Sequence, residues 1–324
     1  MKHNSTFLVL VLAMLLHLNA SATKWRVSNV PGVSANFTTA QAINDSAVVL
    51  PGDTAYFEGS GISYGNLILT KKLVIIGPGF YLVQNDSTQD NHLSAIIDNL
   101  DFDPGSDFSI LTGMTVGNLY PKSNNLAIKR NLINSSLDFG NGAPSSNALV
   151  IQNVIGQIIV RSGSHNLYIC NNHITLGIAW QYAITMQTNT SASILNNVLH
   201  VGVVINDCEY RNNINTGHSN YGTGGLSVNG ISIFTNNLFY ENQGFDNGNI
   251  SNVDMTTVFN YTGSSDAQYK LKAGSPAIGA GYGGVDCGMF GGAYPYVLSG
   301  MPTVPAIWGI YINGTNVVVK AKSH

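Results

Sequence analysis

Short runs of alternating apolar and polar residues recur along the chain, and most of them end at one or two asparagines. The apolar residues stand five and three positions before the last asparagine, as Leu126 and Ile128 do before Asn131. Side chains two positions apart on a β-strand share a face, so this spacing predicts strands with one buried face. The same spacing precedes Asn172, Asn197 and Asn213. Before Asn237 we expect one inserted residue, which places Ile231 and Ile233 on the buried face.

The asparagines recur at a period that is typical of a solenoid. The last asparagine of each motif is residue 131, 153, 172, 197, 213 or 237, so the intervals are 22, 19, 25, 16 and 24 residues. A repeat of this length is one structural unit that buries its apolar face by stacking on its neighbours. We therefore predict an all-β, single-stranded, right-handed parallel β-helix. Its asparagines would lie one above the other and hydrogen-bond through their side-chain amides.

The two ends of the chain depart from the repeat. A basic start, an apolar run from Phe7 to Leu18 and the small residues Ala20-Ser21-Ala22 predict a signal peptide. No later apolar run is long enough to span a membrane, so we expect no transmembrane segment in the mature chain. We divide the chain into a signal peptide, an N-terminal cap with a short helix, a parallel β-helix and C-terminal cover strands, at residues 1–22, 23–49, 50–290 and 291–324.

Three stretches together resemble the secreted right-handed parallel β-helix repeat proteins of Bacteroidota-type bacteria. They are Asn36–Ile43 with Pro51–Thr54, the asparagine series, and Ala273–Gly281 with Val285–Gly292. The resemblance implies a secreted protein, located outside the cell, on its surface or in the periplasm. The fold is shared with pectate lyases and polygalacturonases. It therefore suggests a polysaccharide or cell-surface glycan as partner without establishing an activity.

Composition narrows the function classes. Only 10% of the residues are charged and the formal net charge is −3, whereas a nucleic-acid-binding protein needs a dense basic face. We therefore expect no nucleic acid partner. The three cysteines, Cys170, Cys208 and Cys287, are widely spaced. We interpret them as buried single thiols rather than as a disulfide framework or a zinc site.

The central repeats offer few residues for cleaving a polysaccharide. A lyase needs carboxylates that hold calcium and a basic residue that removes a proton, and Arg161 and Arg211 are candidates for the second role. Asp207 and Glu209 share the strand face of Arg211, which we interpret as an outer, solvated face. A hydrolase would need clustered acids, and Gly217-His218-Ser219 lacks the acid that such a site would place there. Catalytic residues therefore stay unassigned.

Two patterns bear on metal binding. Asp101, Asp103 and Asp107 have the spacing of a calcium loop, but Thr112 stands where its bidentate glutamate belongs. We keep calcium as an alternative to a plain turn and expect no other cofactor. Single histidines could ligate a metal only if the coils stack them, and we interpret them as solvated turn residues: His165, His173, His200 and His218.

Aromatic residues suggest a binding surface. Trp180 and Tyr182 lie in the longest interval of the series, where aromatic rings could stack on sugar rings or pack against the solenoid wall. With Arg161 and Arg211 they are our ligand-binding candidates. We predict a non-catalytic secreted or cell-surface protein that presents an extended face to a glycan or another surface. A polysaccharide lyase or glycoside hydrolase is one alternative, and a structural stalk is the other.

Overall fold

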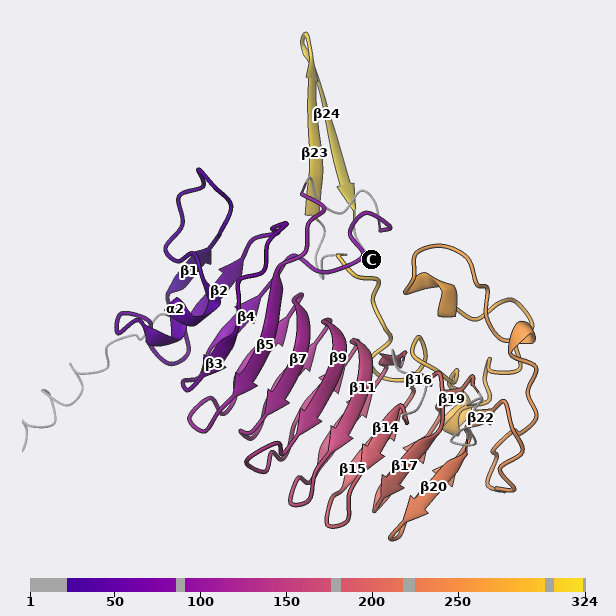
Figure 1. The fold of residues 1–324 in the computed structure, drawn as a ribbon. Coiled ribbons are helices and arrows are strands. Elements are labelled where there is room, and N and C mark those ends of the chain that lie inside the picture. Colours follow the sequence, from indigo (N-terminus) through magenta and orange to yellow (C-terminus); the bar gives the residue numbers. More distant parts are fainter. Residues whose placement is uncertain (1–21, 86–90, 176–181, 218–224, 301–305, 323–324) are drawn as a thin grey trace, which may run out of the picture.

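The computed structural model describes residues 22–85, 91–175, 182–217, 225–300 and 306–322. Two long parallel sheets dominate it, and the chain alternates between them so that successive coils stack along one axis (Figure 1). This architecture is a parallel β-helix, as predicted. No helix in the described part of the chain is long and apolar enough to cross a membrane.

The first sheet has ten parallel strands, one from each coil. They are β1 (Lys24–Val27), β2 (Thr54–Phe57), β4 (Val74–Ile76), β6 (Ile110–Thr112), β8 (Ala127–Lys129), β10 (Leu149–Ile151), β12 (Leu167–Cys170), β15 (Ala192–Leu195), β18 (Cys208–Arg211) and β21 (Ile233–Thr235).

The second sheet has twelve parallel strands and divides at β11, which pairs with both β13 and β14. Its strands are β3 (Leu67–Leu69), β5 (Ile96–Phe102), β7 (Thr115–Pro121), β9 (Leu132–Phe139), β11 (Val154–Val160), β13 (His173–Ile174), β14 (Ile184–Met186), β16 (Val198–Leu199), β17 (Val203–Asn206), β19 (Ile214–Asn215), β20 (Leu226–Asn229) and β22 (Leu238–Phe239).

Alternation along each strand builds the core, because every second side chain enters the space between the sheets. The strand register of the first sheet stacks one buried file along the axis, formed by Ile128, Val150, Ile169, Ile194, Tyr210 and Phe234. Phe234 holds the usual place three residues before Asn237. The expected insertion is therefore absent, and the prediction that Ile231 and Ile233 are buried is wrong: they are 84% and 61% exposed.

The predicted asparagine ladder runs through the turn between the two sheets. In Asn172 the side-chain oxygen accepts from the backbone N–H and the Nδ2 of Asn153, at 2.9 and 3.0 Å, and its Nδ2 donates to Asn197 Oδ1 at 3.0 Å. The same contacts link the whole series, which Asn249 extends by one coil: Asn131, Asn153, Asn172, Asn197, Asn213, Asn237 and Asn249.

The residue before each of the first six ladder asparagines has a different role. It adopts the left-handed backbone conformation, with φ between 52° and 58°, where asparagine is favoured among side-chain-bearing residues. Its side chain points out of the core and, from the sixth ladder coil back to the second, binds a segment of the chain that returns along the solenoid. These residues are Arg130, Gln152, Asn171, Asn196, Asn212 and Asn236.

The returning segment, residues 253–299, is here called the C-terminal strap. It contains the short 3-10 helices η1 (Met255–Thr257), η2 (Ala267–Tyr269) and η3 (Tyr282–Gly284). It crosses the coils in reverse order, as the side-chain amides of four turn residues show: Asn236 donates to Ala280 O, Asn196 to Asp286 O, Asn171 to Met289 O and Gln152 to Pro295 O. At its end the Ser299 hydroxyl accepts from Phe80 N at 2.8 Å, beside the coil of β4.

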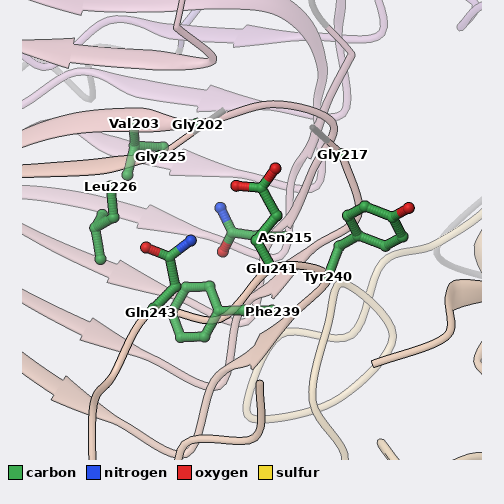
Figure 2. Close-up of a pocket in the computed structure, with 10 residues that line it drawn as sticks. All are labelled: Gly202, Val203, Asn215, Gly217, Gly225, Leu226, Phe239, Tyr240, Glu241 and Gln243. Carbon is green, nitrogen blue, oxygen red and sulfur yellow. The ribbon is translucent and has the colours of Figure 1, made fainter. Parts of the chain in front are cut away.

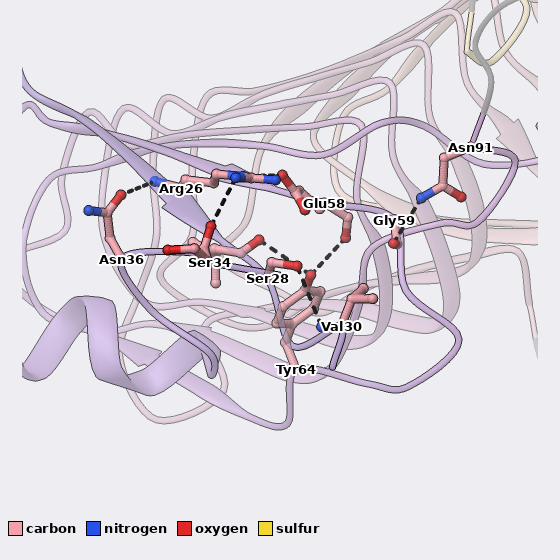
Figure 3. A network of polar contacts seen from close by, with 10 residues as sticks. Arg26, Ser28, Val30, Ser34, Asn36, Glu58, Gly59, Tyr64 and Asn91 are labelled. Carbon is pink, nitrogen blue, oxygen red and sulfur yellow. Dashed lines mark hydrogen bonds and ion pairs between the residues drawn. The ribbon is translucent and has the colours of Figure 1, made fainter. Parts of the chain in front are cut away.

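The N-terminal end of the solenoid is covered. Helix α2 (Ala40–Asp45) begins after Thr39, whose hydroxyl accepts from Ala42 N, and it buries Ala40 and Ile43. The free edge of β1 pairs with Phe37. A polar network around Arg26, which binds Glu58 and the Ser34 carbonyl, holds the loop that follows β1 (Figure 3).

The end of the chain differs from our expectation. Strands β23 (Ala306–Asn313) and β24 (Asn316–Lys322) form an antiparallel hairpin that stands away from the coils (Figure 1). Its side chains from Ile310 to Lys320 are exposed. The prediction that these strands cover the last coil is therefore wrong, and the strap returns along the side of the solenoid before the hairpin begins.

Candidate functional site

A file of polar side chains lies on the outer face of the second sheet, across its first coils. Asn99 donates from Nδ2 to Asn66 Oδ1 at 3.0 Å, Asn118 donates to Asn99 Oδ1 at 3.0 Å, and the Ser136 hydroxyl donates to Asn118 Oδ1 at 3.1 Å. Neighbouring strands are about 4.8 Å apart, so the file presents one hydrogen-bonding group per coil. We call these four residues the amide file.

A second row begins two residues further along the same strands. The register places Asp101 beside Tyr120, and Asp138 follows on the next strand, β9. Asp138 is 3% exposed and accepts from Arg161 Nε and Nη2 at 2.8 and 2.7 Å. This double hydrogen bond raises the pKa of Arg161 and fixes its guanidinium against the face.

Lys122 lies at the neighbouring coil of this row. Its Nζ is 2.5 Å from Asp101 Oδ1 and 3.0 Å from Asp103 Oδ1. Burial lowers the pKa of Lys122, but the hydrogen bonds and charges of the two aspartates outweigh it, and the pKa is raised. We call Asp101, Asp103, Lys122, Asp138 and Arg161 the charged edge. With the amide file and Tyr120 they form the polar face.

The calcium alternative does not fit this geometry. The ammonium group of Lys122 binds the two carboxylates that a cation would need, and Asp107 Oδ1 accepts from Asn124 N at 2.9 Å. The three aspartates therefore serve an ion pair and a turn. Among the described residues there is also no cluster of three or more acids, histidines and cysteines that could hold a metal ion.

The other ligand-binding candidates are not brought together. Arg211 is on the opposite sheet from Arg161, where it pairs with Glu209 at 2.9 Å and lies 5.0 Å from the ring centroid of Tyr282 in the strap. Tyr182 is half-buried, and its carbonyl accepts from Gln157. Trp180 and His218 lie outside the described residues.

Stacking does join two of the histidines, contrary to the expectation of solvated turn residues. His173 and His200 lie on neighbouring coils with their Nε2 atoms 2.8 Å apart, and the ring of Tyr269 covers His173 at 4.1 Å between centroids. Burial lowers the pKa of His200 to about 4 and, with the charge of His200, lowers the pKa of His173 well below its usual value. The neutral pair belongs to the contact between coil and strap.

The cysteines are free and buried, as expected. Burial raises the pKa of Cys170 to about 11 and the pKa values of Cys208 and Cys287 to about 12. The thiolate is the nucleophilic form, so these side chains act as small apolar groups at neutral pH.

A small hollow lies near the last coils (Figure 2). It is lined by Asn215, Tyr240, Glu241 and Gln243 among others, and the Asn215 oxygen accepts from Tyr210 OH at 2.7 Å. Glu241 is the only carboxylate among the described residues around it. Glycoside hydrolysis normally requires two, so this hollow does not reproduce that chemistry.

The polar face is therefore the best-formed candidate site, and sequence reasoning identified only its edge. Arg161 and the aspartates were candidates, whereas the amide file was missed because Asn66, Asn99 and Asn118 lie outside the repeated motif. The sequence does contain a signal for the amide file, because Asn99 and Ser136 stand two positions before Asp101 and Asp138 and so share their strand face. No family model, curated protein or solved structure matches the chain.

Proposed function

We propose that this protein is secreted and binds an extended glycan along the polar face without cleaving it. The observation that carries the proposal is that the charged side chains of this face bind one another. Its lysine and arginine are paired with its aspartates, so the face offers amides, a hydroxyl and the Tyr120 ring in regular rows. Such groups suit the hydroxyls and apolar ring faces of sugars.

The regular spacing favours a polymer over a small molecule. One hydrogen-bonding group per coil is a linear array, and the distance between coils is comparable to the length of one sugar residue in an extended chain. Secretion is supported by the apolar leader predicted for residues 1–22, and the parallel β-helix is a fold that many extracellular polysaccharide-active proteins use.

The proposal is tested by measuring binding of the mature chain to neutral and acidic polysaccharides. We expect Tyr120→Ala to weaken binding about tenfold, which corresponds to ~1.4 kcal/mol. Tyr56→Ala is the matched control, because Tyr56 is 40% exposed on the other sheet, and it should bind as wild type does.

The outcomes separate the alternatives. Equal loss in both variants, or no binding by wild type, contradicts a glycan site on the polar face. New unsaturated or reducing ends would indicate a lyase or a hydrolase, and Arg161→Ala and Arg211→Ala would then identify the basic residue involved. A protein without binding or turnover would be a structural stalk.

A further inference from the structure

The terminal hairpin exposes apolar side chains on both of its faces. Cross-strand pairs Ile310–Val319 and Ile312–Val317 lie on one face, and Tyr311–Val318 lies on the other. All six side chains are more than half exposed. An isolated two-stranded hairpin is marginally stable in water, and its two outer backbone edges are free to pair. The hairpin therefore has the properties of an element that completes its packing on another surface.

The far end of the solenoid also exposes apolar side chains and an unpaired strand edge. Within the described residues strand β20 pairs only with β17, so it has one unpaired edge. Strand β21 is the last strand of its sheet, and its outer edge is partly bonded by the loop that follows, where Phe234 O accepts from Asn249 Nδ2 and Asn236 N donates to Asn247 O. Beside these edges Val228, Ile231 and Ile233 are exposed, and they border a hollow floored by the stacked rings of Phe234 and Phe245. We call this surface the open end.

The two ends of the solenoid differ in charge and in whether their strand edges are already paired. The hairpin sequence, residues 306–322, contains two lysines and no acidic residue, whereas residues 225–250 contain Glu241 and Asp246 and no basic residue. The N-terminal strand β1 is basic, with Lys24 and Arg26, and its edge is already paired with Phe37. The hairpin is therefore complementary to the open end and not to the opposite one.

The hairpin cannot lie along the open end of its own molecule. Residues 299 and 300 are held at the coil of β4, through Phe80 and Gly79. In the first sheet β21 lies seven strands beyond β4, which is ~34 Å at 4.8 Å per strand. Residues 301–305 span at most ~20 Å up to the first hairpin residue when fully extended. Strand β20 directly precedes β21 in the same coil, so a strand laid along its free edge must come from another chain.

We propose that hairpin β23–β24 docks on the open end of a second copy of this protein. The hairpin adds a strand to the free edge of β20, and its apolar face covers Ile231, Ile233 and Phe245. The two surfaces differ and lie on different parts of the chain, so each copy keeps one of each free and the contact repeats head to tail. This assembly does not depend on glycan binding.

The test uses two full-length variants with surface substitutions in one partner surface each. The end variant is Ile231→Lys with Ile233→Lys, and the hairpin variant is Ile312→Glu with Val317→Glu. All four positions are exposed, so the fold is retained. Val83→Lys, at a position that is 75% exposed and outside both surfaces, is the control.

Light scattering and sedimentation velocity report the mass as concentration rises. Wild type and Val83→Lys should associate progressively, each variant alone should stay monomeric, and a mixture of the two variants should form a one-to-one complex and stop there. A wild-type protein that stays monomeric overturns the proposal. So does association of the end variant alone, which would show hairpin-to-hairpin contact, or a mixture that remains monomeric.

Discussion

Each pair of turn residues carries two separate roles. The second, as in Asn172, is fully buried and is bonded through both of its side-chain groups, so it satisfies backbone atoms that water cannot reach. The first, as in Asn171, supplies a left-handed backbone residue and an outward amide that binds the strap at Met289 and Gly291. In a pair of adjacent asparagines, the second therefore forms the internal ladder and the first attaches the strap.

Loss of a buried ladder asparagine should lower the free energy of unfolding substantially. In Asn172→Leu the backbone N–H of Asn153 and the carbonyls of Val150 and Cys170 lose their partner, and buried groups without partners are costly. We expect the free energy of unfolding to fall by ~2–4 kcal/mol in denaturant titrations.

The matched control is Asn134→Leu, which makes the same change at an exposed position of β9. It should change the free energy of unfolding by ~0.5 kcal/mol or less. Similar losses at the two sites would contradict the ladder.

At the scale of elements, the strap acts as a brace across the coils. Met289 and Cys287 are fully buried against Val198 and Ile214, which project outward from the second sheet. This contact converts the outer side of several coils into core. The strap thus ties coils together that otherwise touch only their neighbours.

Truncation of a strap side chain should therefore destabilise the whole solenoid. We expect Met289→Ala to lower the free energy of unfolding by ~2–5 kcal/mol, because a large buried apolar group is removed. Ile278→Ala, in the same strap but 50% exposed, should have a small effect. Equal effects, measured by thermal unfolding and limited proteolysis, would show that the strap is loosely attached.

The histidine pair makes strap attachment sensitive to acid. Both pKa values are lower in the folded state than in the unfolded chain. The neutral pair therefore makes its full contribution to the free energy of unfolding above pH ~6.5, and this contribution is lost as the pH falls toward about 4. The His200 shift alone corresponds to a loss of ~3 kcal/mol by pH 4.

A comparison of variants isolates this contribution. His173→Gln with His200→Gln should show a flatter fall in unfolding free energy between pH 6.5 and 4 than wild type. Tyr269→Phe keeps both histidines and should retain the wild-type slope. Parallel slopes in wild type and the double variant would contradict a buried neutral pair.

Local patterns predicted the coils but not what crosses them. Leu167 and Ile169 before Asn172 revealed the strand face, because alternation and turn asparagines act within one repeat. The strap contacts join residues such as Asn171 and Gly291, which are 120 positions apart, and no local period encodes them. The error at Ile231 and Ile233 has a local cause, because Phe234 takes the inward position three residues before Asn237 and leaves Ile233 on the outer face.

At the scale of the whole molecule, the strap and the polar face divide the outer side of the second sheet. The strap covers an apolar file that includes Val154, Val198 and Ile214, from the middle coils onward. The amide file and the charged edge occupy the earlier coils, where the face stays accessible. Binding and bracing thus use different parts of one regular surface.

The most direct measurement of non-catalytic glycan binding is the length of a polysaccharide recovered after prolonged incubation with the mature protein. We predict that the polymer is retained by the protein and is released, after denaturation, with an unchanged size distribution. Polymer that is never retained, or that returns shortened with new chain ends, would contradict it.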